Sequence, residues 1–133
     1  MDLVEHVAKA LHDGWMQYQE HQGVVYGPEK VRGVTHPHLV EWNQLKEDVE
    51  SQNQDRFQAA LILYEYANGS ITEANLREKI HAFWLLWEKI HGTAKEHKHA
   101  KPYPEAHPDG PGEHADQAAL IWPILKSIPS EFQ

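Results

Sequence analysis

Histidine is the residue with the widest chemical range in this sequence. It occurs 11 times in 133 residues, and imidazole serves both as a metal ligand and as an acid or base near neutral pH. In His12-Asp13 it precedes a carboxylate, and metal-dependent phosphohydrolases use this dyad to hold an ion that acidifies a bound water. Such a site also needs a His from a different helix and a later Asp, whereas the upstream candidate, His6, falls on the same predicted helix. A metal-dependent phosphohydrolase is therefore the weakest of three functions that the sequence suggests.

Further histidines lie in or beside a stretch rich in Lys, Pro and Gly. They are His97, His99, His107 and His114. These side chains could scavenge a transition metal, but the sequence has no His-Glu-x-x-His pair and no four-ligand spacing. Cysteine is absent, which excludes a thiol nucleophile, and neither a Gly-x-Ser-x-Gly turn nor a phosphate-binding glycine loop occurs. We expect no metal, no cofactor and no catalysis.

The elements that must position these residues are predicted to be mainly helical. Apolar residues recur at spacings of three and four in four segments, as in helices that bury one stripe. The first predicted helix is capped by Asp2 and ends at Gly23, the second begins at Ser51 or Asn53 and ends near 67–70, the third runs from Thr72 to Gly92, and the fourth spans about 113–128. Pro123 lies inside the last helix, where its missing N–H predicts a kink or an early end.

The segments between these helices are predicted to be irregular. Val24-Val25-Tyr26 is at most a short strand, because glycines bound it on both sides. Residues 29–43 have no sustained period and are expected to form a folded loop that packs by Leu39, Val40 and Trp42. Residues 93–112 contain few apolar side chains and predict a long loop.

Composition limits the partners and the compartment. The chain has 41% hydrophobic and 24% charged residues, and its length suits one globular domain spanning residues 1–133. Its net charge of −8 would repel the phosphate backbone of a long nucleic acid. The apolar runs are too short to span a membrane, and Asp2 and Glu5 stand where a secretion signal is basic and then apolar. We expect a cytoplasmic protein that binds neither membranes nor long nucleic acids.

An internal repeat organises the same residues. His12 and His81, Trp15 and Trp84, and Gly23 and Gly92 are each 69 positions apart, and His36-Pro37 returns as His107-Pro108. The pentapeptide Gln-Ala-Ala-Leu-Ile occurs at 58–62 and again at 117–121. Five features in the same order predict two repeats, at residues 1–69 and 70–133. The second repeat has Ala82 in place of Asp13, so it keeps the His and the Trp but loses the dyad.

The first repeat resembles a known family, the ryanodine-receptor repeat domain. The resemblance covers about residues 4–66 and rests on His12, Trp15, Gly23, Tyr26-Gly27, His36-Pro37-His38-Leu39-Val40, Trp42, Leu45 and Asp55-Arg56. Val24-Val25 stands where the family usually has a Trp, and the second repeat lacks the Tyr-Gly and Leu-Val elements. The resemblance implies a mainly α fold with short β-strands, built from two tandem helix-turn-helix-like repeats related by a pseudo-two-fold axis. The chain is similar to small free-standing prokaryotic and viral members.

The resemblance also implies a function, because this domain is thought to sense nucleotides or nucleotide-derived signals in several contexts, including bacterial or phage signalling. It suggests a cleft between the repeats with Trp15 and Trp84 facing it. An indole stacks on a purine for about 1–3 kcal/mol, and Lys30 and Arg32 would neutralise phosphates. We therefore expect a non-catalytic binder of an adenine-type nucleotide. The expected ligand-binding residues are Trp15, Tyr18, Tyr26, Lys30, Arg32, His36, Trp42 and Trp84.

Structural roles for the same residues remain open. Both tryptophans could be core anchors of their own repeat, Tyr26, His36 and Trp42 could serve only to fold the turn, and Lys30 and Arg32 could be solvated charges. An interaction or oligomerisation module is the alternative function. The helix that bears Phe83, Trp84 and Trp87 has a broad apolar surface, and a homodimer would bury it.

Overall fold

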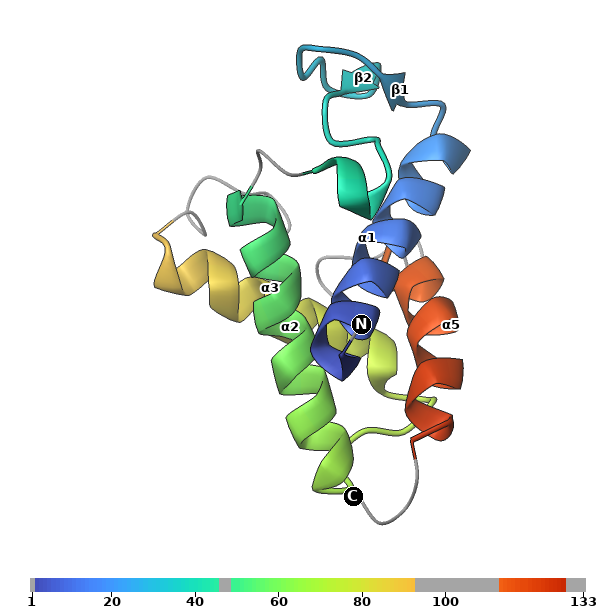
Figure 1. Cartoon of the computed structure of the whole chain (residues 1–133), viewed down its shortest axis with the longest axis vertical. Coiled ribbons are helices and arrows are strands. Elements are labelled where there is room, and N and C mark those ends of the chain that lie inside the picture. The colour runs from blue at the N-terminus through green and yellow to red at the C-terminus, as the bar shows by residue number, and fades with distance from the viewer. Residues whose placement is uncertain (1, 46–48, 93–112, 129–133) are drawn as a thin grey trace.

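Four α-helices and one short two-stranded sheet make up the described part of the chain (Figure 1). The structure, a computed structural model, describes residues 2–45, 49–92 and 113–128. Its elements are α1 (Leu3–His21), β1 (Val25–Tyr26), β2 (Thr35–His36), the 3-10 helix η1 (Trp42–Gln44), α2 (Val49–Ala67), α3 (Leu76–Ile90) and α5 (Glu113–Lys126). The predicted mainly helical fold with short strands is confirmed. The predicted loop at 93–112, with His97, His99 and His107, lies outside the described residues.

Helix α1 begins and ends as its sequence predicts. The Asp2 carboxylate accepts a hydrogen bond from the Glu5 backbone N–H at 2.8 Å, which satisfies one of the donors left unpaired at a helix start. The helix ends at His21, and Gly23 follows with a φ of +82°, a backbone conformation that favours glycine.

Helices α2 and α3 begin at other residues than predicted. Helix α2 starts at Val49, before the expected caps. Helix α3 starts at Leu76 rather than Thr72, because Thr72 and Asn75 close a turn of their own. The Thr72 N–H donates to Asn75 Oδ1 at 2.8 Å, and the Asn75 N–H donates to Thr72 Oγ1 at 3.2 Å. Side chain–backbone bonds of this kind compete with the first turn of a helix.

Helix α5 continues through Pro123 and ends three residues later, at Lys126. Proline lacks the N–H that would bond one turn back, so the helix loses one internal bond and stops short of the predicted end at residue 128.

The two strands form a small parallel sheet above the C-terminal end of α1 (Figure 1). Val25 pairs with Thr35 and Tyr26 with His36. The prediction placed β2 and η1 in an irregular loop, since each is only two or three residues long and has no period to detect. Gly27 permits the pairing, because a Cβ there would lie 2.6 Å from the Thr35 Cβ.

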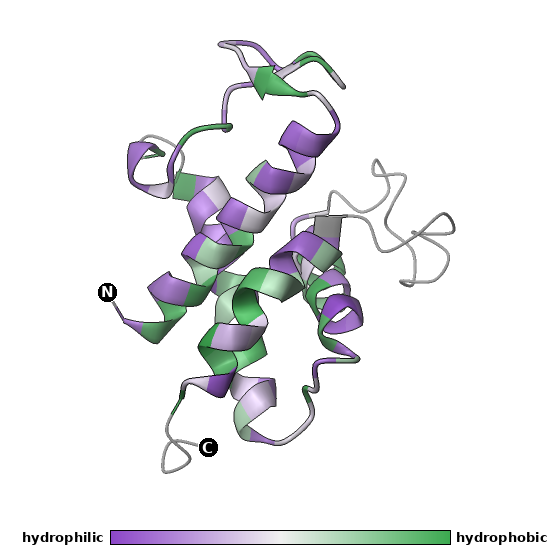
Figure 2. Cartoon of the chain, turned by 90° about the vertical axis from the view of Figure 1, so that its right-hand side faces the viewer, coloured by the Kyte–Doolittle hydropathy of each residue, from purple (hydrophilic) through white to green (hydrophobic). Residues whose placement is uncertain are grey.

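The core lies where the four helices meet. Helix α1 packs against α2 and α5, and α3 packs against the same two helices. Side chains from all four helices are fully buried in one cluster, among them Leu11, Ile62, Ile80, Ile121 and Leu125. In Figure 2 the hydrophobic residues gather in the middle of the helices, whereas the C-terminal part of α1 is mostly hydrophilic. None of the described helices is both long and apolar enough to cross a bilayer.

Candidate ligand-binding site

A cleft of about 840 Å³ opens beside the hydrophilic end of α1. Its walls come from all four helices and from the segment that carries the two strands. The cleft brings together six of the eight predicted ligand-binding residues: Trp15, Tyr18, Lys30, Arg32, His36 and Trp84. The two tryptophans come from different helices, α1 and α3, which do not follow one another in the chain.

Trp15 is held in its wall by two imidazoles. The His12 ring stacks on it at a centroid distance of 5.7 Å, and the His36 ring meets it edge-on at 4.8 Å. His36 reaches this position because strand pairing fixes β2 beside β1. The His12 side chain is only 3% exposed, and its Nε2 donates to the Val40 carbonyl oxygen at 2.7 Å.

His12 is kept uncharged by its surroundings. Burial is the main cause that lowers the pKa of His12 below its usual value of 6.5, and the hydrogen bond to the Val40 carbonyl opposes this only in part. A neutral ring that donates from Nε2 has its Nδ1 as an acceptor. The His12 ring that stacks on Trp15 is therefore neutral and carries its proton on Nε2.

Trp84 is supported in a similar way by His81, whose ring lies 5.4 Å from it at an angle of 35°. His81 is 1% exposed, and its Nδ1 lies 3.2 Å from Nε2 of His114. His114 Nδ1 lies 2.9 Å from Gln117 Oε1, and Gln117 Nε2 donates to the Leu11 carbonyl oxygen at 3.0 Å. This buried relay connects α3 with α1 through α5.

The direction of the hydrogen bonds in the relay follows from the group at one end of it, the backbone carbonyl of Leu11. A backbone carbonyl only accepts, so the Gln117 amide donates to Leu11 from Nε2 and accepts at Oε1. His114 must then donate from Nδ1 to Gln117, while its Nε2 bonds to Nδ1 of His81. Both cleft-supporting histidines, His12 and His81, thus have a protein partner for one ring nitrogen.

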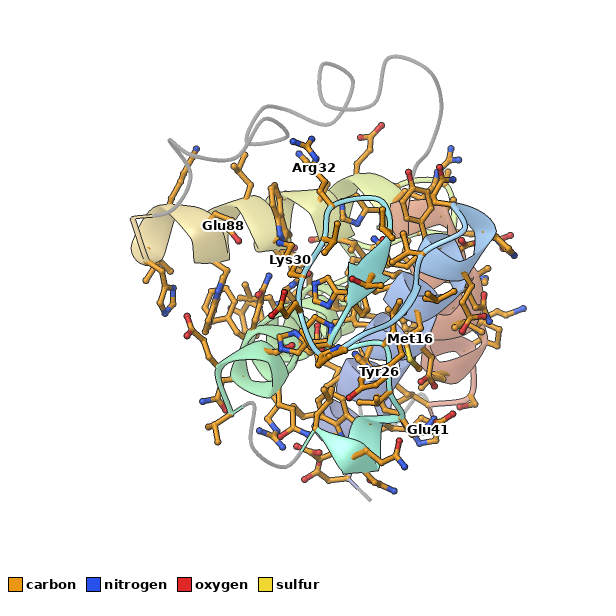
Figure 3. The ribbon with its side chains drawn as sticks, turned by 90° about the horizontal axis from the view of Figure 1, so that it is seen from above. Met16, Tyr26, Lys30, Arg32, Glu41 and Glu88 are labelled. Carbon is orange, nitrogen blue, oxygen red and sulfur yellow. The ribbon has the colours of Figure 1, made fainter. Side chains whose placement is uncertain are left out.

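Lys30 and Arg32 form a basic edge on the loop that precedes β2. Both are exposed and line the cleft. Figure 3 shows them on the side of the loop nearer to α3 and Glu88, whereas Tyr26 lies on the other side of the loop in this view. Two carboxylates, of Asp55 on α2 and Glu88 on α3, line the cleft as well. The site therefore offers cations from the loop and acceptors from the helices.

Tyr26 and Trp42 do not line the cleft with the other six. Tyr26 is 58% exposed on β1, and its neighbour in the pair, His36, faces Trp15 instead. Trp42 is 3% exposed in the core, where its ring lies 6.0 Å from that of His12 and 5.5 Å from the Arg56 guanidinium. Trp42 packs against His12, the histidine that stacks on Trp15. Its position in the core is the structural one that the sequence left open beside ligand binding.

A family model described as RyR domain matches residues 1–73, which is more than half of the chain. The chain belongs to the RyR domain family. This confirms the resemblance and extends it a few residues beyond both predicted ends. No curated protein and no solved structure gave a significant match. The match contains Trp15, the basic edge and α2, whereas Trp84 lies beyond it.

The side chains of His12 and Asp13 in this RyR domain bond to different partners. His12 turns toward Val40, while Asp13 pairs with Lys9 at 2.6 Å. Among residues 2–45, 49–92 and 113–128, no group of three or more His, Cys, Asp or Glu side chains could hold a metal ion. Of the loop histidines, only His114 is described, and it belongs to the buried relay.

Sequence reasoning missed a polar stripe on α2 of the RyR domain. Ser51, Gln54, Asp55 and Gln58 all line the cleft. Their positions i, i+3, i+4 and i+7 put them on one helix face, and the same face would carry apolar residues in a helix that only packed on a core. The sequence of this stretch is clearly polar. The recurrence of its polar residues at i, i+3, i+4 and i+7 is the signal that predicts a helix face lining a cleft.

Proposed function

We propose that this RyR domain is a non-catalytic binding module for an adenine-type nucleotide or a nucleotide-derived signalling molecule. The observation that carries the proposal is that Trp15 and Trp84 line one cleft together with Lys30 and Arg32. The cleft volume of about 840 Å³ falls in the range of about 300–1,000 Å³ of small-molecule sites. A nucleotide combines the two features that the cleft complements, a planar ring and negative charge.

The proposed roles follow from the chemistry of each wall. The indoles supply stacking faces, which tolerate any purine. Arg32 offers a planar fork of donors for phosphate oxygens, and Lys30 adds a point charge beside it. His12 and His36 hold the Trp15 ring in place before the ligand arrives, which lowers the entropic cost of binding.

We also propose that the cleft lies between two repeats related by a pseudo-two-fold axis, at residues 1–69 and 70–133. Several pairs of corresponding features support this. The His12–Trp15 and His81–Trp84 rings lie at 5.7 and 5.4 Å with angles of 29° and 35°. Gly23 and Gly92 both have positive φ after their helices, and each of α1 and α3 packs on both α2 and α5.

The decisive experiment is a nucleotide screen by thermal shift, followed by calorimetric titration of the compounds that respond. A ligand that binds the folded state raises the melting temperature by mass action. Trp15→Ala and Trp84→Ala should each weaken binding by about 1–3 kcal/mol, the usual contribution of base stacking. Trp87→Ala is the matched control, because Trp87 lies one turn beyond Trp84 on α3 but packs on Phe57 and His91 outside the cleft.

Two results would contradict the proposal. One is a flat response to mono-, di-, tri- and cyclic nucleotides. The other is a loss of affinity in Trp87→Ala that equals the loss in Trp15→Ala and Trp84→Ala, because it would mean that the substitutions act through stability rather than through the cleft.

An interaction module remains the alternative function, and one observation favours it. Val25, Tyr26, Val31 and Val34, on β1 and the loop after it, are each 47–59% exposed. On α3, where the sequence suggested a surplus apolar face, Phe83 is buried in the core and Trp87 packs on Phe57. Sedimentation analysis separates the two functions, since a dimer that Val34→Ser dissociates would favour an interface.

A further inference from the structure

We propose that Gln58 is the residue that reads the base of the bound nucleotide, by pairing its side-chain amide with the polar edge of an adenine. This inference rests on the proposed function. The inference goes beyond the proposed function because it assigns the choice of base to one side chain on α2, separate from the stacking faces and from the basic edge.

Gln58 is the buried, unpartnered polar group of the cleft wall. It is 4% exposed and lines the cleft, and its helix packs against both α1 and α3, which carry the two indoles. No hydrogen bond joins its amide to another residue in the described part of the chain, and its oxygen and nitrogen are not among the fully enclosed side-chain atoms that lack a partner. The amide therefore reaches the open space of the cleft, where a partner from outside the chain can bond to it.

Gln117 shows what the same side chain does when its role is structural. It occupies the corresponding place in the second copy of the pentapeptide, and it is 7% exposed. Its amide makes both of its bonds within the chain, to the Leu11 carbonyl and to His114. Both glutamines are buried, yet among the described residues only Gln117 bonds to the chain, so the Gln58 amide is available to a ligand in the cleft.

The amide of glutamine matches adenine because each presents one donor beside one acceptor. Gln58 Oε1 would accept from the 6-amino group while Nε2 donates to the adjacent ring nitrogen, the pairing by which Gln recognises adenine in nucleic acids. Gln54 and Asp55 lie one turn away on the same helix face. A bound base that stacks on an indole would turn its edge, rather than its face, toward this polar stripe.

A cycle of protein and ligand changes tests the pairing. The probes are ATP, ADP, AMP and cyclic AMP, their guanine counterparts, and the purine riboside form of the tightest adenine nucleotide, which lacks the 6-amino group. We expect wild type to lose roughly tenfold in affinity when the amino group is removed. Gln58→Met, of similar shape but without polar atoms, should bind both forms equally weakly, so that the two changes are not additive.

Gln58→Glu provides the reverse test. A carboxylate only accepts, so the variant should lose affinity for adenine and gain affinity for guanine, whose Watson–Crick edge presents two adjacent N–H groups. Gln17→Met on the exposed face of α1, outside the cleft, is the matched control and should bind as wild type does. Because the Gln58 side chain makes no hydrogen bond to the residues that the structure describes, Gln58→Met should keep the melting temperature and the helical circular dichroism of the wild type.

The outcomes separate this inference from the function on which it rests. If wild type binds none of these nucleotides, the proposed function fails and the inference fails with it. If wild type binds them but Gln58→Met discriminates the 6-amino group as strongly as wild type, the function stands and the inference is overturned. Non-additive losses together with a base switch in Gln58→Glu would support both.

Discussion

His12 makes stability depend on pH in a definite direction. Its folded-state pKa is lowered by burial, so below about 6.5 the unfolded chain binds a proton that the folded chain resists. Unfolding then becomes easier as the pH falls. We expect the free energy of unfolding, measured by urea denaturation, to be constant above neutral pH for this group and to decrease from about pH 7 toward pH 5.

His12→Gln isolates this effect, because an amide can still donate to the Val40 carbonyl but does not titrate. The difference in unfolding free energy between wild type and His12→Gln should shrink or reverse as the pH falls through this range. His6→Gln, at an exposed position of the same helix, is the control. A pH slope in His12→Gln equal to that of wild type would contradict the role assigned to burial.

The contribution of Arg32 to nucleotide binding should depend on the salt concentration. It is exposed on the loop at the cleft edge, where attraction to phosphate is screened by salt. Arg32→Ala should therefore weaken binding at low ionic strength and matter much less at about 1 M salt. Calorimetry at several salt concentrations measures this, with Arg77→Ala, an exposed arginine of α3 outside the cleft, as the control. An equal loss at all salt concentrations would point to a structural effect.

At the scale of single residues, the sequence predicted which aromatic pair would share a cleft but not which aromatic ring would be buried. Trp15 and Trp84 were identified by their equal spacing from His12 and His81. Trp42 belongs to the same family pattern, yet it lies in the core, because the 3-10 helix that it begins, η1, places it under His12 and beside the buried Leu45. The burial of the Trp42 ring depends on its contacts with α1 and α2, and these contacts cannot be read from the residues around it in the sequence.

Among the elements, the strand pair controls where the basic edge lies. Lys30 and Arg32 belong to the loop that joins β1 to β2, and this loop is closed by the parallel pairing of Val25 with Thr35. Gly27→Ala would place a Cβ 2.6 Å from Thr35 Cβ, an atom that cannot swing away. The strands should separate, and nucleotide affinity should fall while the helical circular dichroism stays unchanged.

The measurement pairs calorimetric titration with far-ultraviolet circular dichroism of the same sample. Gly33→Ala is a useful comparison, because no atom lies within 4 Å of its Cβ position although its φ of +76° disfavours alanine. If Gly27→Ala binds a nucleotide as tightly as wild type does, the strand pair does not position the basic edge.

The helices were easier to predict than the elements between them. Asp2 and Gly23 gave α1 clear ends, whereas β2 is too short to show alternation and pairs with a strand ten positions away. The start of α3 was misplaced because the reciprocal Thr72–Asn75 bonds form a separate turn. Local signals therefore set the ends of α1 and the start of α3, whereas the sheet depends on pairing between residues ten positions apart.

At the scale of the whole molecule, α1 and α5 approach each other closely at Gly14. A Cβ at Gly14 would lie 2.6 Å from Gln117 Cα and 2.8 Å from its backbone nitrogen. Gly14→Ala gains about 1 kcal/mol in helix propensity, but it must push two backbones apart, and overpacking of this kind costs about 1–3 kcal/mol. We expect a net loss of stability and a displaced Gln117 that weakens the relay to His81.

Thermal and urea unfolding test this expectation, with Gln17→Ala on the exposed face of α1 as a control for helix propensity. A rise in the melting temperature of Gly14→Ala equal to that of the control would show that the two helices have room to move. The sequence indicated neither this contact nor the relay, because both depend on residues more than 100 positions apart.

The bond from Gln117 to Leu11 spans 106 positions, and this distance has a consequence during synthesis. At about 5–20 residues per second, α1 leaves the ribosome roughly 5–20 s before the part of α5 that covers it. Throughout this interval the apolar side chains of Val7 and Leu11, fully buried in the finished fold, have no partner from α5. The α5-facing side of nascent α1 is therefore open to a chaperone during this interval, and the cleft is completed only when α5 docks and connects its two tryptophan walls.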